Sequence, residues 1–592
     1  MQKRIQDAVK IIVKELYDIE ASPKQLLVQK TLPDFEGDFT VVVFPFTKIA
    51  RKSPQLLGEE IGQKLKASMS EIASFNVIKG FLNLTLKNEV WLDFLQENYK
   101  QKNYGLVSEK AEGTAVIEFS SPNTNKPLHL GHIRNNLLGD SIARILEAAG
   151  REVKRVNLIN DRGIHICKSM LAWQKWGQEE TPERSGLKGD HLAGKYYVLF
   201  DQKLKAEKEA LRKQGVEEEM LETKSKLMGE AREMLRKWEA RDENVMQLWE
   251  KMNAWVYDGF DVSYQRMGIS FDRVYYESKT YLLGKKMVLK ALEQGVLVQK
   301  EDGSVWADLS DHNLDEKILL RKDGTSVYMT QDLGTAKLRK EDFDPSEMLY
   351  VVGNEQDYHF TVLKIILKKM GYDWGRLIEH ISYGMVELPH GKMKSREGTV
   401  VDADDLMDEM LETARKMTSE LGKIDDLNSP DAQKLYETIS MGALKYFILK
   451  VDPKKNMLFN PDESVNFNGH TGPFIQYTHA RIQSLLRKSN AIVPDVSLYD
   501  PMKMLTVEKN ILIKLAEYPT VIQDAAREKN PAVVANFTFE LVKMYNAFYQ
   551  DVPVLKENDN SIVHFRLAMS VFVGHVVKSS MKLLGIQVPD RM

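Results

Sequence analysis

The chain has 592 residues, of which 43% are hydrophobic and 28% are charged. Because single domains are several times shorter, this length predicts about three or four domains with an ample core. No apolar run approaches the roughly 20 residues that span a bilayer, so we expect no membrane partner. The 82 basic and 85 acidic residues leave a net charge of −3, which by itself gives no indication of a nucleic-acid partner.

A single cysteine, Cys167, excludes an internal disulfide and a zinc cluster built from thiolates. This cysteine content is typical of a reducing compartment. We therefore expect a cytoplasmic protein without a tightly bound metal.

The first part of the chain predicts an amphipathic helix and then a small α+β domain. Apolar residues of the first stretch recur at helical spacing, and Asp7 and Glu15 argue against a transit peptide. Short apolar runs alternate with helical segments over residues 26–86, separated by proline and glycine turn signals. We expect this domain to occupy residues 1–107.

A strand, a helix and a second strand are predicted next. TAVIEFSS (114–121) has the composition of a buried strand, and SPNTNKP is a turn-rich break. Apolar residues on one face then predict a helix from Leu130 to its stop at Gly150, and EVKRVNLIN (152–160) predicts the second strand. Residues 114–160 should therefore form a βαβ unit of a parallel sheet.

The rest of the chain is mostly helical in pattern. Residues 184–255 are densely charged, which is typical of a helical insertion with solvated faces. Short strands that could complete the sheet are predicted at SVWADLS, TSVYMT, EMLYVVG and HISYGMV. From about Asp404 to the end we expect helices only.

A nucleotide-binding signal lies between the first strand and the helix of the βαβ unit, in residues 121–132. Ligands bind at this position in α/β sheets, and a helix N-terminus favours anions. His129 and His132 lie three apart in the first turn, and Gly131 leaves room for a base or ribose. Two histidines alone are more typical of a helix-surface pair or a partial metal site. The surrounding strand, turn, lysine and helix favour a nucleoside triphosphate.

Two other phosphate signals are weaker. The glycines and lysine of GDHLAGK (189–195) have P-loop spacing, but Tyr196 stands where a Ser or Thr should hold magnesium, and no strand precedes Gly189. No GxGxxG follows a strand, so a dinucleotide dehydrogenase has no support. The basic loop GKMKSREG (391–398) could close on a departing pyrophosphate, although alone it is only a basic surface turn.

These residues resemble a known family. His129-Leu-Gly-His132 resembles the HIGH signature of class I aminoacyl-tRNA synthetases, and Lys392-Met-Lys-Ser-Arg396 resembles a degenerate KMSKS loop. The longer string EFSSPNTNKPLHLGHIRN is similar to that of arginyl-tRNA synthetases. Further similar stretches, in chain order, are GFLNLTL, NLINDRG, SVYMTQD, YVVGNEQDYH, FNGHTGPFIQYTHARIQSLLRK and LLGIQVPDRM.

The resemblance implies a multidomain α/β protein with a Rossmann-like class I catalytic domain at residues 108–403, interrupted by the helical insertion at 184–255. A tRNA-contacting α+β domain would precede it at 1–107, and a helical anticodon-binding domain would follow at 404–592. The implied reaction joins L-arginine to the 3′-terminal adenosine of tRNA(Arg) through arginyl-adenylate. ATP with Mg2+ is the implied co-substrate, and a chain with every expected domain is expected to be a monomer.

The resemblance also implies roles for individual residues. His129 and His132 would donate to the phosphates of ATP. The second lysine of KMSKS is replaced by Ser395, so Lys126 would take its place at the pyrophosphate, assisted by Lys392 and Lys394. The implied ATP-binding residues also include Gly131, Gly353, His359 and Ser395.

For arginine, the resemblance implies that Tyr328 and Asp332 hold the guanidinium, assisted by Glu118. The implied contacts of the α-amino and carboxylate groups are Ser120, Asn123 and Gln356. Without the family, Tyr328 is more typical of a core aromatic, and Asp332 of a helix cap.

For tRNA, the resemblance singles out Tyr545 and Met592 as anticodon contacts. Aromatics at helical spacing, such as Tyr545, Phe548 and Tyr549, are nevertheless more often core. The charged insertion could also touch an acceptor stem. GDFTVVVFPF (37–46) has valines where relatives typically have polar residues, which argues against elbow recognition by the first domain.

Two alternatives remain open at this stage. One is a class I ligase for another amino acid, and the other is a tRNA-binding paralogue that has lost activation. The degenerate basic loop is compatible with the second alternative.

Overall fold

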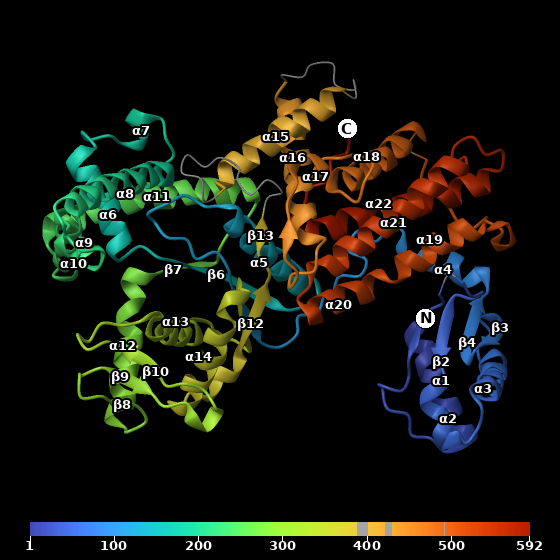
Figure 1. Ribbon diagram of the computed structural model, residues 1–592. Helices are drawn as coiled ribbons and strands as arrows, with labels where there is room; N and C mark the ends of the chain where they lie inside the picture. The colour runs from blue at the N-terminus through green and yellow to red at the C-terminus, as the bar shows by residue number, and fades with distance from the viewer. Residues whose placement is uncertain (33, 388–400, 421–428, 491) are drawn as a thin grey trace. The chain divides into compact units, whose positions relative to one another are not determined.

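The computed structural model describes residues 1–32, 34–387, 401–420, 429–490 and 492–592 (Figure 1). The chain forms two compact units, each built from separate segments of sequence. One unit contains residues 1–104, 482–518 and 540–576, and the other contains residues 105–481, 519–539 and 577–592.

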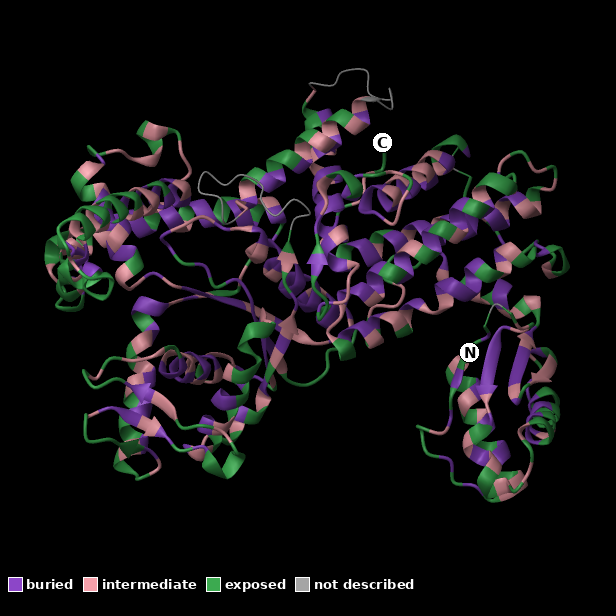
Figure 2. Ribbon diagram, in the orientation of Figure 1, coloured by how far each residue is buried: buried purple, intermediate pink, exposed green. Residues whose placement is uncertain are grey.

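The first unit begins with the predicted α+β domain. Its four-stranded antiparallel sheet has the order β1-β2-β4-β3, and it packs against α1, whose predicted apolar face is buried at Ile5, Val9, Ile12 and Val13. Figure 2 shows the buried strands at its centre. The elements are α1 Gln2–Tyr17, β1 Val28–Lys30, β2 Phe39–Val42, α2 Phe44–Ala50, α3 Pro54–Ser68, β3 Ile72–Ile78, β4 Phe81–Leu86 and α4 Asn88–Asn98.

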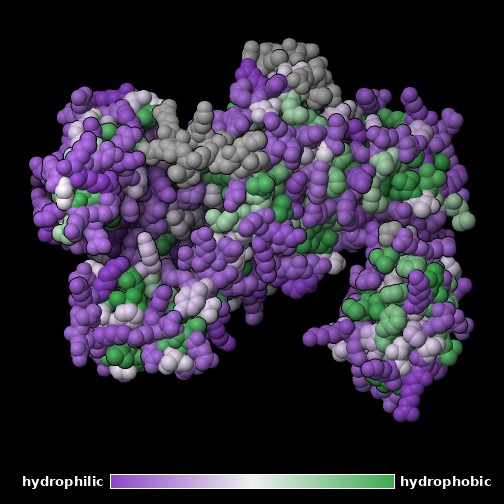
Figure 3. Space-filling view, in the orientation of Figure 1, coloured by the Kyte–Doolittle hydropathy of each residue, from purple (hydrophilic) through white to green (hydrophobic). Residues whose placement is uncertain are grey.

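The valines of residues 37–46 have a structural explanation. Val41 is 1% exposed and Val43 is fully buried, so both belong to the core of this domain. Other apolar side chains lie on its surface (Figure 3), and those exposed by 42–56% are Leu27, Leu32, Phe44, Ile49 and Leu56. Contact of this domain with the tRNA elbow stays a prediction.

The second unit contains a five-stranded sheet with the order β12-β11-β5-β6-β7, and every neighbouring pair is parallel. Helix α5 connects β5 to β6, which confirms the predicted βαβ unit and parallel sheet. The strands are β5 Thr114–Glu118, β6 Glu152–Ile159, β7 Arg273–Tyr276, β11 Glu347–Gly353 and β12 Ile378–Tyr383, and α5 covers Leu130–Ala148.

The charged stretch between β6 and β7 is helical, as expected. Its helices are α6 Ile164–Trp176, α7 Pro182–Ser185, α8 Gly189–Lys213, η1 Glu218–Met220, α9 Leu221–Lys224, α10 Lys226–Glu239 and α11 Glu243–Met267. Gly189 opens α8 at a close helix crossing, because a Cβ atom there would lie 1.9 Å from the carbonyl oxygen of Trp255. The glycine of the discarded P-loop pattern is thus required for helix packing.

Of the four later strand predictions, three are confirmed as strands, but one of these joins another sheet, and the fourth is wrong. SVWADLS contributes β9 Val305–Ala307 to a separate antiparallel sheet with β8 Val298–Gln299 and β10 Lys317–Leu320. TSVYMT forms a single bridge at Ser326, and then the helix α13 Tyr328–Phe343 begins. The alternating pattern is too short to maintain a strand ahead of such a long helix-forming sequence.

The remaining elements are mainly helices. They are α12 Glu277–Glu293, η2 Ser310–His312, η3 Asn354–Gln356, α14 Asp357–Lys369, η4 Asp373–Leu377, α15 Ala403–Glu420, α16 Pro430–Leu449, α17 Pro461–Ser464, α18 Gly472–Lys488, η5 Pro501–Lys503, α19 Thr506–Ala516, α20 Tyr518–Glu528, α21 Pro531–Asp551 and α22 Asn560–Leu583. The short strand β14 Met457–Leu458, paired with β13 Val386–Glu387, departs from the all-helical expectation after Asp404.

Helix α22 is long and apolar enough to cross a membrane by length and composition, contrary to the sequence expectation. However, 67% of its most apolar window is buried inside the protein. A helix that is apolar on most sides is equally typical of a protein core.

Candidate active site

The start of α5 is fixed to the carboxyl edge of the parallel sheet. Asn135, in the second turn, accepts a hydrogen bond from the backbone amide of Ser120 (2.6 Å) and donates to the carbonyl of Val351 (2.6 Å) and the hydroxyl of Tyr383 (3.1 Å). Ser120 has a left-handed backbone (φ 62°), which is uncommon for a non-glycine residue and frequent at functional sites. Sequence reasoning gave Asn135 no role, although it lies in the family string.

The two histidines of the signature lie together at this helix start. Their ring centroids are 3.8 Å apart, and the backbone amide of His129 donates to Nδ1 of His132 at 3.2 Å. Burial, with Lys126 nearby, lowers the pKa of His129 to about 4. Burial, then the charges of His129 and Lys126, hold the pKa of His132 well below its usual value. His132 is therefore neutral at physiological pH, and because Nδ1 accepts, its proton is on Nε2.

Gly131 and Lys126 flank this pair. A Cβ atom on residue 131 would lie 3.0 Å from the imidazole of His129, so the glycine makes room for that ring. Lys126 is half-buried, and burial lowers its pKa. Its side chain lines the neighbouring pocket, in keeping with a lysine that faces a polyanionic substrate.

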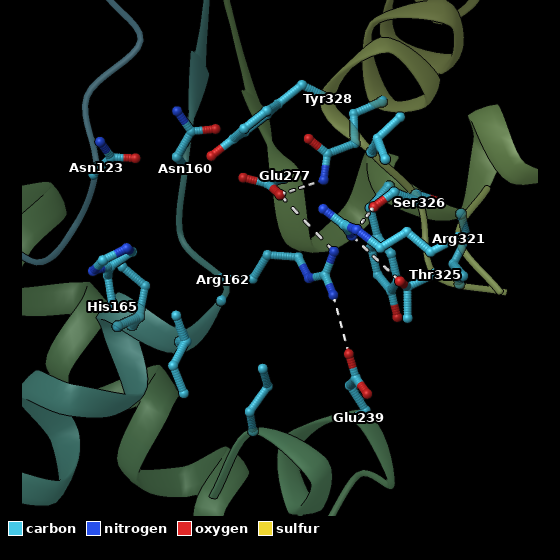
Figure 4. A pocket seen from close by; sticks show the side chains of 18 of the residues that line it. Asn123, Asn160, Arg162, His165, Glu239, Glu277, Arg321, Thr325, Ser326 and Tyr328 are labelled. Carbon is cyan, nitrogen blue, oxygen red and sulfur yellow. Dashed lines mark hydrogen bonds and ion pairs between the residues drawn. The ribbon is translucent and has the colours of Figure 1, made fainter. Parts of the chain in front are cut away.

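A polar pocket of about 880 Å³ opens beside the sheet edge (Figure 4). It is bounded by the β5–α5 and β6–α6 loops, α10, α12 and the segment that joins β10 to α13. This volume is in the range of small-molecule sites. Its charged lining residues are Lys126, Arg162, Glu239, Glu277, Lys285, Arg321 and Asp323.

Arg162 lies among these charged residues and pairs with two of them. Arg162 pairs with Glu239 (3.3 Å) and Glu277 (3.9 Å), and its guanidinium lies 3.9 Å from the ring centroid of Tyr281. Glu277 also accepts a hydrogen bond from Gln331 at 2.7 Å, and burial raises its pKa to about 7. Figure 4 shows the ion pairs of Arg162 with Glu239 and Glu277. Sequence reasoning did not single out Glu277, which follows a strand as an ordinary acidic helix start.

The two residues expected to hold the guanidinium lie one turn apart at the start of α13. Tyr328 is the first residue of the helix and is 79% exposed at the pocket, where its ring extends toward Asn160 (Figure 4). Asp332 accepts a hydrogen bond from Nε2 of His359 at 2.6 Å. The structure therefore joins His359, expected near ATP, to a residue expected at arginine.

The other residues expected at arginine or ATP differ in accessibility. Asn123 is exposed and lines the pocket, Gln356 is exposed in η3, and Gly353 ends β11. Ser120 is 1% exposed, and its hydroxyl lies 2.7 Å from that of Tyr264.

Glu118 is engaged within the protein. Its carboxylate forms an ion pair with Arg339, and only 8% of the residue is exposed. Burial raises the pKa of Glu118, and the charge of Arg339 opposes that rise. A buried carboxylate requires such a partner. Direct contact of Glu118 with arginine stays a prediction.

Lys392, Lys394 and Ser395 lie outside the described residues, but the chain on both sides of them contacts α5. Arg134 donates to the carbonyls of Met385 (3.2 Å), Pro453 (3.0 Å) and Lys455 (2.7 Å). On the other side, the amide of Leu130 donates to Val401 (2.9 Å), and that of Ala403 donates to Leu128 (3.0 Å).

The two residues expected to contact the anticodon, Tyr545 and Met592, differ in burial. Tyr545 is fully buried and donates to the hydroxyl of Ser570 at 3.0 Å, and Phe548 is also fully buried. A base cannot stack on a buried ring, so the expectation for Tyr545 does not agree with the structure. The aromatic spacing marks a core face, the alternative that helical periodicity favoured. Met592 is half-buried, and its contact with tRNA stays a prediction.

The parallel sheet, the paired histidines at the start of α5 and the adjoining pocket define a class I aminoacyl-tRNA synthetase. A family model of the class I (R) tRNA synthetase catalytic domain matches residues 95–460. The arginyl tRNA synthetase N terminal domain matches residues 1–86, and the DALR anticodon binding domain matches 475–592. The catalytic model ends at residue 460 and the DALR model begins at residue 475, so both limits lie after the boundary predicted at residue 404.

Full-length relatives support the same family. The chain is 54% identical to the arginine–tRNA ligase of Parabacteroides distasonis over 595 residues, which covers 100% of both chains. It is also 54% identical to that of Bacteroides thetaiotaomicron over 98% of both chains. The arginyl-tRNA synthetase of Thermus thermophilus has the same fold (TM-score 0.80, 24% identity, 100% of both chains). The chain belongs to the arginyl-tRNA synthetase family, which makes it an arginine–tRNA ligase.

Proposed function

We propose that the start of α5 binds and orients ATP, while the start of α13 selects arginine. The Nε2–H of neutral His132 would donate to a phosphate oxygen, because Nδ1 is already occupied by the amide of His129. His129 would be the second donor. The hydrogen bond from the amide of His129 to Nδ1 of His132 is the observation that carries this assignment.

In the first step, a carboxylate oxygen of arginine would attack the α-phosphorus of ATP. The bond to the bridging oxygen would break, and its electrons would leave with pyrophosphate. In the second step, the 2′-hydroxyl of the terminal adenosine would attack the carbonyl carbon of arginyl-adenylate. The bond from that carbon to the phosphate oxygen would break, its electrons would leave with AMP, and the hydroxyl proton would pass to solvent. Neither step needs a protein nucleophile, so positioning and charge stabilisation account for the rate.

Lys126 would stabilise the charge that develops on the departing pyrophosphate, with Lys392 and Lys394 as auxiliaries. Gly131, Gly353, His359 and Ser395 would complete the ATP site. Mg2+ would arrive on the phosphates of ATP as part of the substrate.

Tyr328 and Asp332 would face the substrate guanidinium, whose five donors need acceptors when it is buried. Asn123, Gln356 and Ser120 would hold the α-amino and carboxylate groups. Glu118 would act close to this site while paired with Arg339. The exposure of Tyr328 at the pocket supports this assignment.

The same proposal covers the partners and the setting of the enzyme. The C-terminal helices, with Met592, would bind the anticodon of tRNA(Arg), and residues 1–107 would contact the tRNA elsewhere. We expect a monomer in the cytoplasm. Light scattering of the purified protein tests the oligomeric state.

The direct test is ATP–pyrophosphate exchange in the presence of tRNA. The proposal predicts exchange that depends on arginine and is absent with lysine or citrulline, which lack the guanidinium. Equal exchange with another amino acid would contradict it. Binding of tRNA without any exchange would favour the inactive-paralogue alternative.

A further inference from the structure

A cluster of charged and polar side chains lies where α8, α11 and α15 meet. Lys188, which precedes α8, forms an ion pair with Asp404 and donates to the hydroxyl of Ser263 at 2.6 Å. That hydroxyl donates to Asp404 at 3.0 Å, and Nε2 of His191 lies 2.9 Å from the same carboxylate. Asp404 is thus held by groups from two other elements. We call Lys188, His191, Ser263 and Asp404 the α15 anchor.

Two glycines allow the backbones of α8 and α11 to approach closely at this place. A Cβ atom on Gly189 would overlap the carbonyl of Trp255, and one on Gly259 would lie 2.4 Å from Asp190. The GDHLAGK segment, discarded as a P-loop, therefore supplies a precise helix junction. His191 lies in this segment and Lys188 directly precedes it, and both side chains contact Asp404.

The anchor is joined to the histidine signature by a short antiparallel ladder. Leu130 donates to Val401 and Ala403 donates to Leu128, so that Asp402 lies opposite His129. Asp402 also caps α15, since its carboxylate accepts from the amides of Asp404 (2.8 Å) and Asp405 (3.2 Å). Asp404 is thus the first residue beyond the ladder whose side chain is fixed to another element.

The same carboxylates could suggest a metal site, because ligand atoms of Asp190, His191 and Asp404 lie within 4.8 Å of one another. Lys188 argues against that interpretation. Its ammonium contacts both Asp404 and Asp190, the latter at 3.2 Å, and already supplies the positive charge. A divalent cation would have to displace it.

We propose that the α15 anchor is a set of positioning residues for ATP activation. It holds residues 401–403 against 128–130 and thereby fixes the backbone that orients His129 and His132. None of the four anchor residues lines the pocket of about 880 Å³. The inference rests on the proposed role of these histidines. It predicts that a substitution in the anchor lowers kcat/KM for ATP more than it changes the KM for arginine.

The test compares Asp404→Asn with Asp405→Asn in tRNA-dependent ATP–pyrophosphate exchange. Asp405 lies in the same helical turn, but its side chain is exposed and outside the anchor. Asp404→Asn removes the negative charge that Lys188 and His191 contact. We expect kcat/KM for ATP to fall about 10- to 100-fold, because small displacements of catalytic groups have effects of this size. The KM for arginine should stay within about twofold of the wild-type value.

Two more variants keep the inference testable if Asp404→Asn folds poorly. Ser263→Ala removes one hydrogen bond to Asp404 and should produce a smaller loss in the same ATP parameter. Lys188→Arg keeps the cation and should retain more ATP activity than Lys188→Met. Thermal unfolding of each variant separates misfolding from mispositioning.

Three results would overturn the inference. Asp404→Asn could behave like Asp405→Asn, the ATP and arginine parameters could fall together in proportion to stability, or Lys188→Met could match Lys188→Arg. A wild-type enzyme with no arginine-dependent exchange would contradict the proposed function itself, and the inference with it.

Discussion

The starts of α5 and α13 are both helix N-termini in the catalytic unit, yet they differ in how far they are fixed. At α5, the histidines are held by a backbone hydrogen bond, a ladder of two backbone hydrogen bonds and Asn135. At α13, Tyr328 is 79% exposed, and Asp332 has His359 as its partner. The comparison indicates that the start of α5, proposed to bind ATP, is held in place by the protein itself, whereas the start of α13, proposed to bind arginine, is open to solvent at Tyr328.

The largest effect is expected from a substitution at the start of α5, the helix start that the protein holds in place. His132→Ala removes the proposed donor to the transferring phosphate, and loss of one such donor lowers kcat by about 100- to 1,000-fold. The KM for arginine should change little. Exchange kinetics provide the measurement, with His312→Ala, at a histidine of η2, as the matched control. An unchanged kcat would show that His132 does not act on ATP.

A smaller effect is expected from a substitution at the start of α13, the more exposed helix start. Asp332→Asn keeps the shape of the side chain but removes the charge that is proposed to face the substrate guanidinium. Hydrogen bonds to charged groups contribute about 1.5–3 kcal/mol, so the KM for arginine should rise about 10- to 100-fold. Asp344→Asn, just beyond the end of the same helix, is the control. A rise in the KM for ATP alone would contradict the assignment.

The pocket beside α13 should also give a pH-dependent signal. Burial raises the pKa of Glu277 from 4.5 to about 7. For a carboxyl whose pKa is raised on folding, the stabilisation is complete below the unfolded pKa and is lost as pH rises through about 7. The wild type should therefore lose stability relative to Glu277→Gln between pH 5 and pH 8.5, by at most about 3 kcal/mol. Parallel urea unfolding at both pH values measures this change, and an equal difference at both would contradict it.

The smallest effect concerns a tyrosine that contrasts with Tyr328. Tyr545 is fully buried, and its hydroxyl bonds to Ser570. Tyr545→Phe should lower the free energy of unfolding by about 1 kcal/mol and leave the KM for tRNA unchanged. A higher KM for tRNA in a variant of normal stability would restore Tyr545 as an anticodon contact.

The sequence predicted the parts of the molecule in which local pattern and tertiary structure agree. The βαβ unit at residues 114–160 and the N-terminal helix have uninterrupted periodicity, and both were confirmed. The strand prediction for TSVYMT (325–330) was wrong because its last three residues already belong to the longer helix-forming sequence of α13. The prediction of Tyr545 as an anticodon contact disagrees with the structure, because the resemblance placed that role on a helix face that the periodicity assigns to the core.

In the candidate site, too, local contacts could be predicted from the sequence and long-range contacts could not. The spacing of His129 and His132 was sufficient to place them at a helix start, since one turn determines their proximity. The contacts of Asp404 with Lys188 and of Asp332 with His359 join residues that are far apart in sequence. A single sequence carries no signal for such pairs, because each residue alone is typical of an ordinary charged surface.

A double-mutant cycle with His132→Ala and Asp332→Asn tests the division between the two helix starts most directly. The quantity to measure is kcat/KM for arginine in ATP–pyrophosphate exchange at saturating ATP. If α5 acts on ATP and α13 acts on arginine, the two losses of transition-state free energy should add to within about 0.5 kcal/mol. A coupling above about 1 kcal/mol would contradict the account, because it would show that the two sides act as one unit.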